Sequence, residues 1–154
     1  MSGAARPWAL AGALCAAVLA ADQAAKAVVE GQLYPGEQVD VLGPLGLTLA
    51  HNNGVAFGLA GGAGAGLVLV TVAALALIVY LFGRDPERRG MWVAVGLLAG
   101  GALGNLLDRV TSDAVTDFIE VGSWPPFNLA DVAITAGVVL MVLIYLRDAE
   151  AEGG

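Results

Sequence analysis

Residues 91–110 read MWVAVGLLAGGALGNLLDRV, an apolar run whose last turns contain Asn105, Asp108 and Arg109. A helix rises about 1.5 Å per residue, so about 20 residues cross the hydrocarbon core of a bilayer, which is about 30 Å thick. Lipid offers no hydrogen-bond partners, and the backbone of a spanning segment must therefore form a helix. We predict a transmembrane helix over residues 91–110 with a polar end.

Three other segments, 8–29, 62–82 and 127–146, are also long and apolar enough to span a bilayer. An alternative for the first is a cleaved signal peptide, because Arg6 precedes an apolar run that ends in small residues. We favour a retained helix, since the rest of the chain is itself a membrane protein. The predicted fold class is an all-α membrane protein with four transmembrane helices in a single domain, residues 1–154.

The composition agrees with this fold. Of 154 residues, 58% are hydrophobic and 14% are charged, and the mean hydropathy is +0.77. Because a soluble domain is about one-quarter charged, these values exclude a disordered chain, a nucleic-acid-binding protein and an ordinary soluble enzyme. With one cysteine, Cys15, and one histidine, His51, the chain cannot form an internal disulfide or a zinc site based on thiolates or histidines.

Basic residues divide unevenly between the two sides that four spans create. The N-terminus, the 83–90 loop and the C-terminal tail share one side, and only Lys26 and Arg109 lie towards the other. Because cytoplasmic loops carry the excess of Lys and Arg, we predict that both termini are cytoplasmic. The basic residues that support this orientation are Arg6, Arg84, Arg88, Arg89 and Arg147.

The extracytoplasmic segments are then residues 30–61 and 111–126. In the first, residues 39–42 and 45–49 are rich in β-favouring residues and flank Gly43-Pro44, which predicts a short hairpin on the membrane surface. In the second, residues 115–119 form one more candidate extended segment.

Polar residues gather at the outer ends of the predicted helices. A charged side chain near a helix centre costs ~2.5–3.5 kcal/mol on insertion scales, so a group of them implies mutual pairing or a water-accessible cavity. Three helices and the adjoining loops deliver such residues to one depth. The set is Asp22, Lys26, Asn52, Asn53, Asn105, Asp108, Arg109, Asp117, Asn128 and Asp131.

Two interpretations stay open for the pairs Asp22–Lys26 and Asp108–Arg109. Each acid has a basic residue within four positions, so both pairs are candidates for ion pairs that only lock the bundle. The other interpretation is that these charged residues take part in the function of the site. Gly96, Gly100 and Gly104 recur every four residues, and this ridge indicates close helix packing rather than function.

Asp117 and Asp131 have no lysine or arginine within four positions. If the loop folds Asp117 over the fourth helix, the two carboxylates share a proton, because like charges a few ångströms apart do not both ionise readily. One carboxylate can then take a proton from water while the other donates to the departing group. The alternative is that Asp131 caps the fourth helix and Asp117 is solvated.

Five motifs occur in order along the chain. They are DQAAK at 22–26, HNNGVAFG at 51–58, GGALGNLLDR at 100–109, VTDFI at 115–119 and FNLAD at 127–131. Together they resemble the motifs of the lipoprotein signal peptidase (signal peptidase II) family of intramembrane aspartic proteases. The departure within these motifs is Val55, where the family pattern has alanine.

The resemblance implies an enzyme of the bacterial plasma (inner) membrane, with its active site near the outer face. It would remove the signal peptide from diacylglyceryl-modified prolipoproteins, cutting on the N-terminal side of the lipidated cysteine. Asp117 and Asp131 would be catalytic, and Asp22, Lys26 and Asp108 would brace the site. Residues that would line the site or hold substrate are Asn53, Gly54, Asn105, Arg109 and Asn128.

The resemblance also implies that the enzyme needs no metal and no organic cofactor. Its partners would be the prolipoprotein and membrane lipid, without nucleic acid, and it would act as a monomer. Two other classes compete with a peptidase. A proton or ion transporter needs acids distributed across the membrane, whereas these acids cluster at one depth. A non-catalytic assembly protein would use the glycine ridge to bind its partner.

Overall fold

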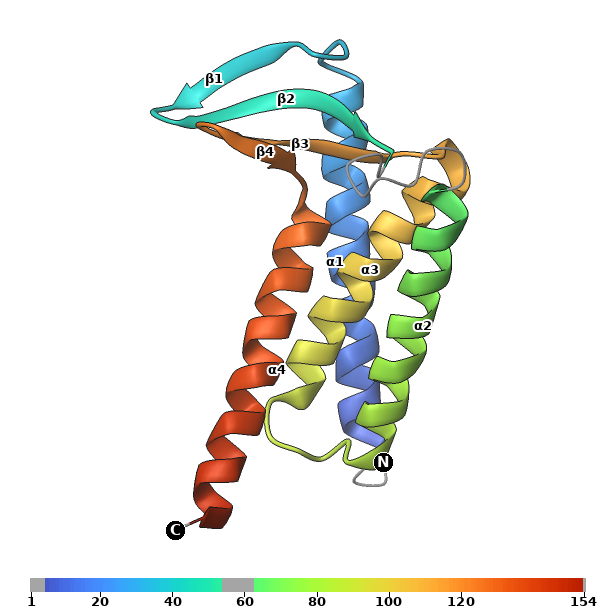
Figure 1. The fold of residues 1–154 in the computed structure, drawn as a ribbon, viewed down its shortest axis with the longest axis vertical. Helices are drawn as coiled ribbons and strands as arrows, with labels where there is room; N and C mark the ends of the chain where they lie inside the picture. The colour runs from blue at the N-terminus through green and yellow to red at the C-terminus, as the bar shows by residue number, and fades with distance from the viewer. Residues whose placement is uncertain (1–4, 54–62, 154) are drawn as a thin grey trace.

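The computed structural model describes residues 5–53 and 63–153, which form four long helices and a four-stranded sheet across one end of them (Figure 1). The helices are α1 (Ala5–Glu30), α2 (Ala63–Arg84), α3 (Met91–Ser112) and α4 (Leu129–Gly153). The strands are β1 (Gln38–Leu42), β2 (Leu45–Asn52), β3 (Val115–Val121) and β4 (Trp124–Phe127).

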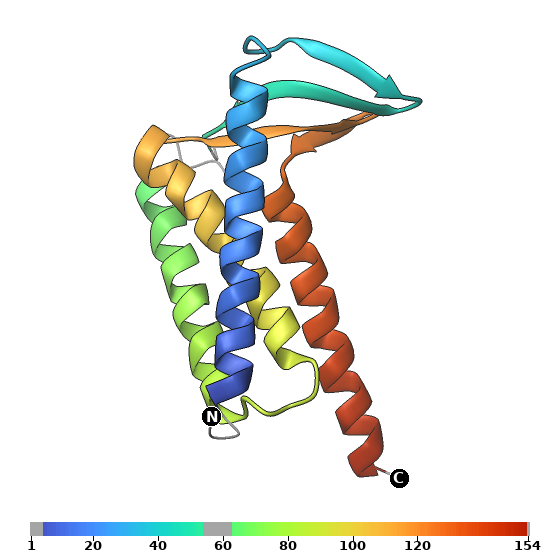
Figure 2. The ribbon, with the colours of Figure 1, turned by 180° about the vertical axis from the view of Figure 1, so that it is seen from behind.

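All four helices are long and apolar enough to cross a membrane, which confirms the prediction of four spanning helices. The surface of the bundle agrees with a lipid environment, because large apolar side chains face outward. Leu69 and Val70 on α2 are 70% and 68% exposed, and Val139 and Leu143 on α4 are also exposed. The helix α3 is the most buried of the four and lies between the others (Figures 1 and 2).

Glycines bring α3 into close contact with its neighbours, as the predicted ridge requires. At Gly96 and Gly100 the backbone of α3 lies against Leu14 and Val18 of α1. On another face, Gly101 lies against the backbone of Ala130 in α4. Small residues at such contacts allow the dispersion and hydrogen-bond interactions that hold helices together in lipid.

Replacing Gly100 with alanine should therefore destabilise the bundle. The added Cβ would lie 2.8 Å from the Cys15 carbonyl oxygen and 2.7 Å from Val18 Cβ, and the carbonyl belongs to a helix backbone that cannot give way. Overpacking of this kind costs about 1–3 kcal/mol. Thermal unfolding in detergent measures the loss. Gly12→Ala on α1 is the matched control, since an added Cβ there meets nothing within 4 Å. Equal stability of the two variants would contradict this account.

The sheet has the order β1-β2-β3-β4, with every neighbouring pair antiparallel. The predicted hairpin is confirmed, and its second strand continues to Asn52. The predicted extended segment at 115–119 is the core of β3. Beneath the sheet, Leu49 and Phe118 pack with Val29, which fixes the sheet on the end of α1 (Figure 2).

The prediction that the fourth helix begins at Phe127 was wrong. Phe127 belongs to β4, where it pairs with Ile119, and the helix begins at Leu129. β4 itself was not predicted, because Pro125 and Pro126 argue against a strand; they are tolerated here because β4 is an edge strand. The predicted start of the second helix at residue 62 lies outside the described residues, as does Gly54.

Candidate active site

Asn128 connects the two aspartates at the junction of β4 and α4. Its Nδ2 donates to Asp117 Oδ1 over 2.8 Å. Its backbone N–H donates to Asp131 Oδ2 over 3.3 Å, and its Oδ1 accepts from the Asp131 backbone N–H over 2.9 Å. The last two bonds form a reciprocal cap at the start of α4. Because Asn128 is fully buried, these bonds are sheltered from water.

Asp131 therefore does cap its helix, as one of the two readings expected, but Asp117 is not solvated. Asp117 is 4% exposed and Asp131 is half-buried. The fold brings them together because β3 returns through β4 directly into the first turn of α4.

Asn105 on α3 supplies the second link in this polar network. Its Nδ2 donates to Asp131 Oδ1 over 2.8 Å. Its Oδ1 accepts from Asn128 Nδ2 over 3.1 Å and from Lys26 Nζ over 3.3 Å. Both oxygens of Asp131 are thus oriented by amide donors from α3 and from the helix cap.

Asn52 belongs to the set of polar residues predicted to gather at one depth, but the family resemblance gave it no role at the site. Its Nδ2 donates to Asp117 Oδ2 over 3.1 Å. Asp117 pairs with Ala50 across the strands, and side chains two residues apart share a face of a strand, so Asn52 faces Asp117. If the second strand of the predicted hairpin had been extended from residue 49 to residue 52, the alternation of side chains along it would have placed Asn52 on the same face as Ala50. The expected residue, Asn53, is exposed and lines a hollow of about 340 Å³ together with Asn52 and Asp117.

Burial raises the pKa of Asp117 from its usual 3.8 to about 6. The hydrogen bond from Asn52 lowers it, the negative charge of Asp131 raises it, and the bond from Asn128 and the charge of Lys26 lower it further. Loss of water around a carboxylate favours its neutral form, and here that effect exceeds the sum of the favourable contacts. Asp117 therefore holds a proton far more readily than an exposed aspartate.

A buried ionic cluster lies behind the aspartates. Lys26 Nζ is 2.7 Å from Asp22 Oδ2, as predicted, and 2.6 Å from Asp108 Oδ2. The predicted Asp108–Arg109 pair is wrong, because successive residues of a helix point in different directions. Within residues 5–53 and 63–153, Asp108 pairs with Lys26 instead, and Arg109 donates to the Asn105 carbonyl oxygen over 3.1 Å.

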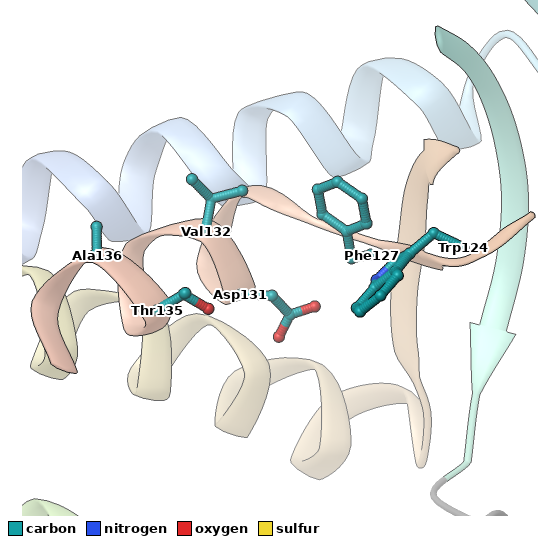
Figure 3. A pocket seen from close by; sticks show the side chains of 6 residues that line it. All are labelled: Trp124, Phe127, Asp131, Val132, Thr135 and Ala136. Atoms are coloured by element: carbon teal, nitrogen blue, oxygen red, sulfur yellow. The ribbon is translucent and has the colours of Figure 1, made fainter. Parts of the chain in front are cut away.

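Asp131 borders two apolar cavities on different sides of α4. One, of about 420 Å³, is bounded by Trp124 and Phe127 of β4 and by Thr135 one turn further along α4, and Figure 3 shows the Asp131 carboxylate between them. The other, of about 430 Å³, lies between α2, α3 and α4, with Asn105 and Arg109 in its wall. A substrate bound in either cavity would reach the same carboxylate.

A family model, curated relatives and a solved structure each match most of this chain. The family model described as signal peptidase (SPase) II matches residues 14–147. The lipoprotein signal peptidase of Moorella thermoacetica is 38% identical over 138 residues, covering 88% of this chain and 92% of the relative. That of Pelotomaculum thermopropionicum is 41% identical over 139 residues, covering 89% and 91%. A solved bacterial membrane enzyme matches with a TM-score of 0.84 at 34% identity, covering 90% of this chain and 93% of that one.

Proposed function

The chain belongs to the signal peptidase II family, the aspartic peptidases that remove signal peptides from prolipoproteins, and we propose that Asp117 and Asp131 are its catalytic pair. It is a multi-pass bacterial membrane protein. The observation that carries the proposal is that Asn128 donates hydrogen bonds to both carboxylates and so holds them close together. The raised pKa of Asp117 supports it, because one member of such a pair must hold a proton.

The pair can hydrolyse a peptide bond with one shared proton. The ionised carboxylate takes a proton from a water molecule, whose oxygen attacks the carbonyl carbon, while the protonated carboxyl group donates to the carbonyl oxygen. The tetrahedral intermediate then collapses, the C–N bond breaks, and the amine leaves with a proton from the pair. The titration belongs to both carboxyl groups together. Amide donors from Asn52, Asn105 and Asn128 hold the reacting oxygens in place.

The two cavities support a placement of the substrate. The cavity between α2, α3 and α4 would accept apolar residues at the end of a signal peptide, with Asn105 and Arg109 positioned to bind peptide carbonyl groups. The cavity beneath Trp124 would accept the diacylglyceryl group. Because Asp131 borders both, the bond next to it is the one that joins the signal peptide to the lipidated cysteine. Cleavage would therefore fall on the N-terminal side of that cysteine.

We also propose that the sheet and the aspartates lie at the outer face of the membrane, with both termini in the cytoplasm. Arg84 ends α2, Arg147 lies in the last turns of α4, and Arg88 and Arg89 lie in the loop from α2 to α3. This end of the bundle is opposite the sheet (Figure 1), as expected for a cytoplasmic side. A monomer suffices for catalysis, because one chain supplies both aspartates and the amides that bind them.

The test is direct incubation of the purified protein with a diacylglyceryl-modified prolipoprotein peptide, followed by mass spectrometry. We expect two products, one of which begins with the lipidated cysteine. The same peptide without its lipid is the control, and it should be cleaved poorly because the cavity beneath Trp124 stays unfilled. An uncleaved lipidated peptide would overturn the proposal, and so would cleavage at another bond.

The pKa of Asp117 predicts the dependence of the reaction on pH. A pair that needs one proton loses its activity as that proton leaves, so kcat/KM should fall as the pH rises above about 6. Asn52→Ala removes a hydrogen bond that lowers the pKa of Asp117, and should move this fall to higher pH. A pH profile of kcat/KM for both proteins checks the direction, and an unmoved or downward shift would contradict it.

The same pKa has a consequence for stability. Because the folded protein binds this proton more tightly than the unfolded chain, the free energy of unfolding should fall as the pH rises from about 4 to about 6. Asp117→Asn should remove that part of the pH dependence. Chemical denaturation of both proteins in detergent across this range measures the difference.

A further inference from the structure

Asp22 on α1 holds the beginning of α4. Its Oδ1 accepts the backbone N–H of Ala130 over 2.9 Å, and Ala130 directly precedes Asp131. The first N–H groups of a helix have no partner within the helix, so this carboxylate fixes the position of the first turn. Gly104 on α3 leaves the space for it, since an added Cβ there would lie 2.7 Å from Asp22 Oδ2. Asp22 and Ala130 are both fully buried.

Asp108 on α3 holds the backbone of β3 in a similar way. Its Oδ2 accepts the backbone N–H of Thr116 over 3.4 Å, and Thr116 directly precedes Asp117. Asp108 is itself held by Gln23, whose Nε2 donates to Oδ1 over 2.8 Å. A buried acceptor thus holds the backbone immediately before each of the two proposed catalytic residues.

Lys26 joins these two acceptors. Its Nζ is 2.7 Å from Asp22 and 2.6 Å from Asp108, and it also donates to Asn105 over 3.3 Å. Lys26 is 3% exposed, so water screens these interactions little. One ammonium group therefore fixes the distance between the two carboxylates that hold α4 and β3.

We propose that Lys26, Asp22 and Asp108 act as a clamp that sets the separation of Asp117 and Asp131. The three are positioning residues, because they act on the aspartates through the backbone, and the inference rests on the proposed catalytic role of that pair. Proton sharing requires the two carboxylates to be a few ångströms apart. A misplacement of about 1 Å at a reacting group costs about 100-fold in rate.

Matched substitutions at one position test the acceptor. Asp22→Asn and Asp22→Leu remove the same charge and leave the ion pair between Lys26 and Asp108 intact. Asparagine still offers an oxygen to the N–H of Ala130, whereas leucine does not. We expect kcat of Asp22→Leu to fall about 100-fold, with Asp22→Asn at least about tenfold more active, and KM changed little in both.

The same comparison applies to Asp108→Asn and Asp108→Leu, where the N–H that loses its acceptor belongs to Thr116. Thermal unfolding shows which variants are folded. For folded variants, equal kcat in the asparagine and leucine forms at both positions would overturn the clamp.

A triple variant decides the question if the leucine forms do not fold. Replacing Lys26 with methionine together with Asp22→Asn and Asp108→Asn leaves no unpaired buried charge and keeps both backbone acceptors. It removes the link between them, and we expect kcat to fall about 100-fold at nearly constant KM. Wild-type kcat in this variant would overturn the clamp. Failure of the wild-type protein to cleave the lipidated peptide, or full activity of Asp117→Asn, would instead overturn the proposed catalytic pair.

Discussion

Replacing either Asp117 or Asp131 with asparagine should lower kcat for the lipidated peptide by about 10⁴-fold. Asparagine has the shape of aspartate but neither takes a proton from water nor donates one as an acid. At each position both carboxylate oxygens accept hydrogen bonds, so the amide group also loses one of them. The lost bond costs about 1–3 kcal/mol of stability, which leaves the catalytic loss as the dominant effect.

Single-turnover cleavage followed by mass spectrometry measures this loss, and thermal unfolding in detergent shows that the variants are folded. The matched control is Asp113→Asn, which makes the same chemical change at an exposed residue just after α3. Asp113 has a φ of 58°, a conformation that asparagine adopts well, and its variant should keep wild-type kcat. Full activity of either site variant would exclude that residue from the chemistry.

Asn128→Leu should lower kcat by about 10³-fold, the upper range for loss of one buried donor at a reacting group. Leucine has a similar size but removes the donor to Asp117 and the cap on the N–H of Asp131. Because the bond from Asn128 lowers the pKa of Asp117, that pKa should rise. Loss of the cap should also cost about 0.5–2 kcal/mol of stability.

Asn128→Asp separates the two roles of this residue. Aspartate is as good a helix cap as asparagine, so the cap on the N–H of Asp131 should be kept. The new carboxylate cannot donate to Asp117 and places a third carboxyl group beside the pair, so kcat should fall as in the leucine variant. Wild-type kcat with a destabilised fold in Asn128→Leu would show that Asn128 only caps the helix.

The spans were predictable because their signals are local in the sequence. An apolar run of sufficient length decides a transmembrane helix by itself, as residues 91–110 illustrate. The predicted spans also predicted that the polar residues share one depth in the membrane, because each of these residues lies near an end of a span. That Asp117 and Asp131 would meet was only one of two readings, since it depends on the path from β3 through β4.

The errors arose where contacts between distant residues override local signals. Because Pro125 and Pro126 argue against a strand, β4 was not predicted. Phe127 belongs to β4, so α4 begins at Leu129 and not at Phe127. Asp108 was assigned to Arg109, its neighbour in sequence, whereas its partner Lys26 comes from another helix. No pattern within α3 encodes that choice, because it depends on how α1 packs against α3. The catalytic roles and the membrane orientation stay predictions.

The pair Asp22–Lys26 has a consequence for how the chain enters the membrane. The two residues lie four positions apart on α1, so the helix neutralises its own charges before any other segment is present. α1 can thus be inserted first without a bare charge in lipid. Asp108 follows later in the chain on α3, and among the described residues the cation that pairs with it is Lys26 of α1. Because an unpaired buried carboxylate is costly, this ion pair favours the association of α3 with α1.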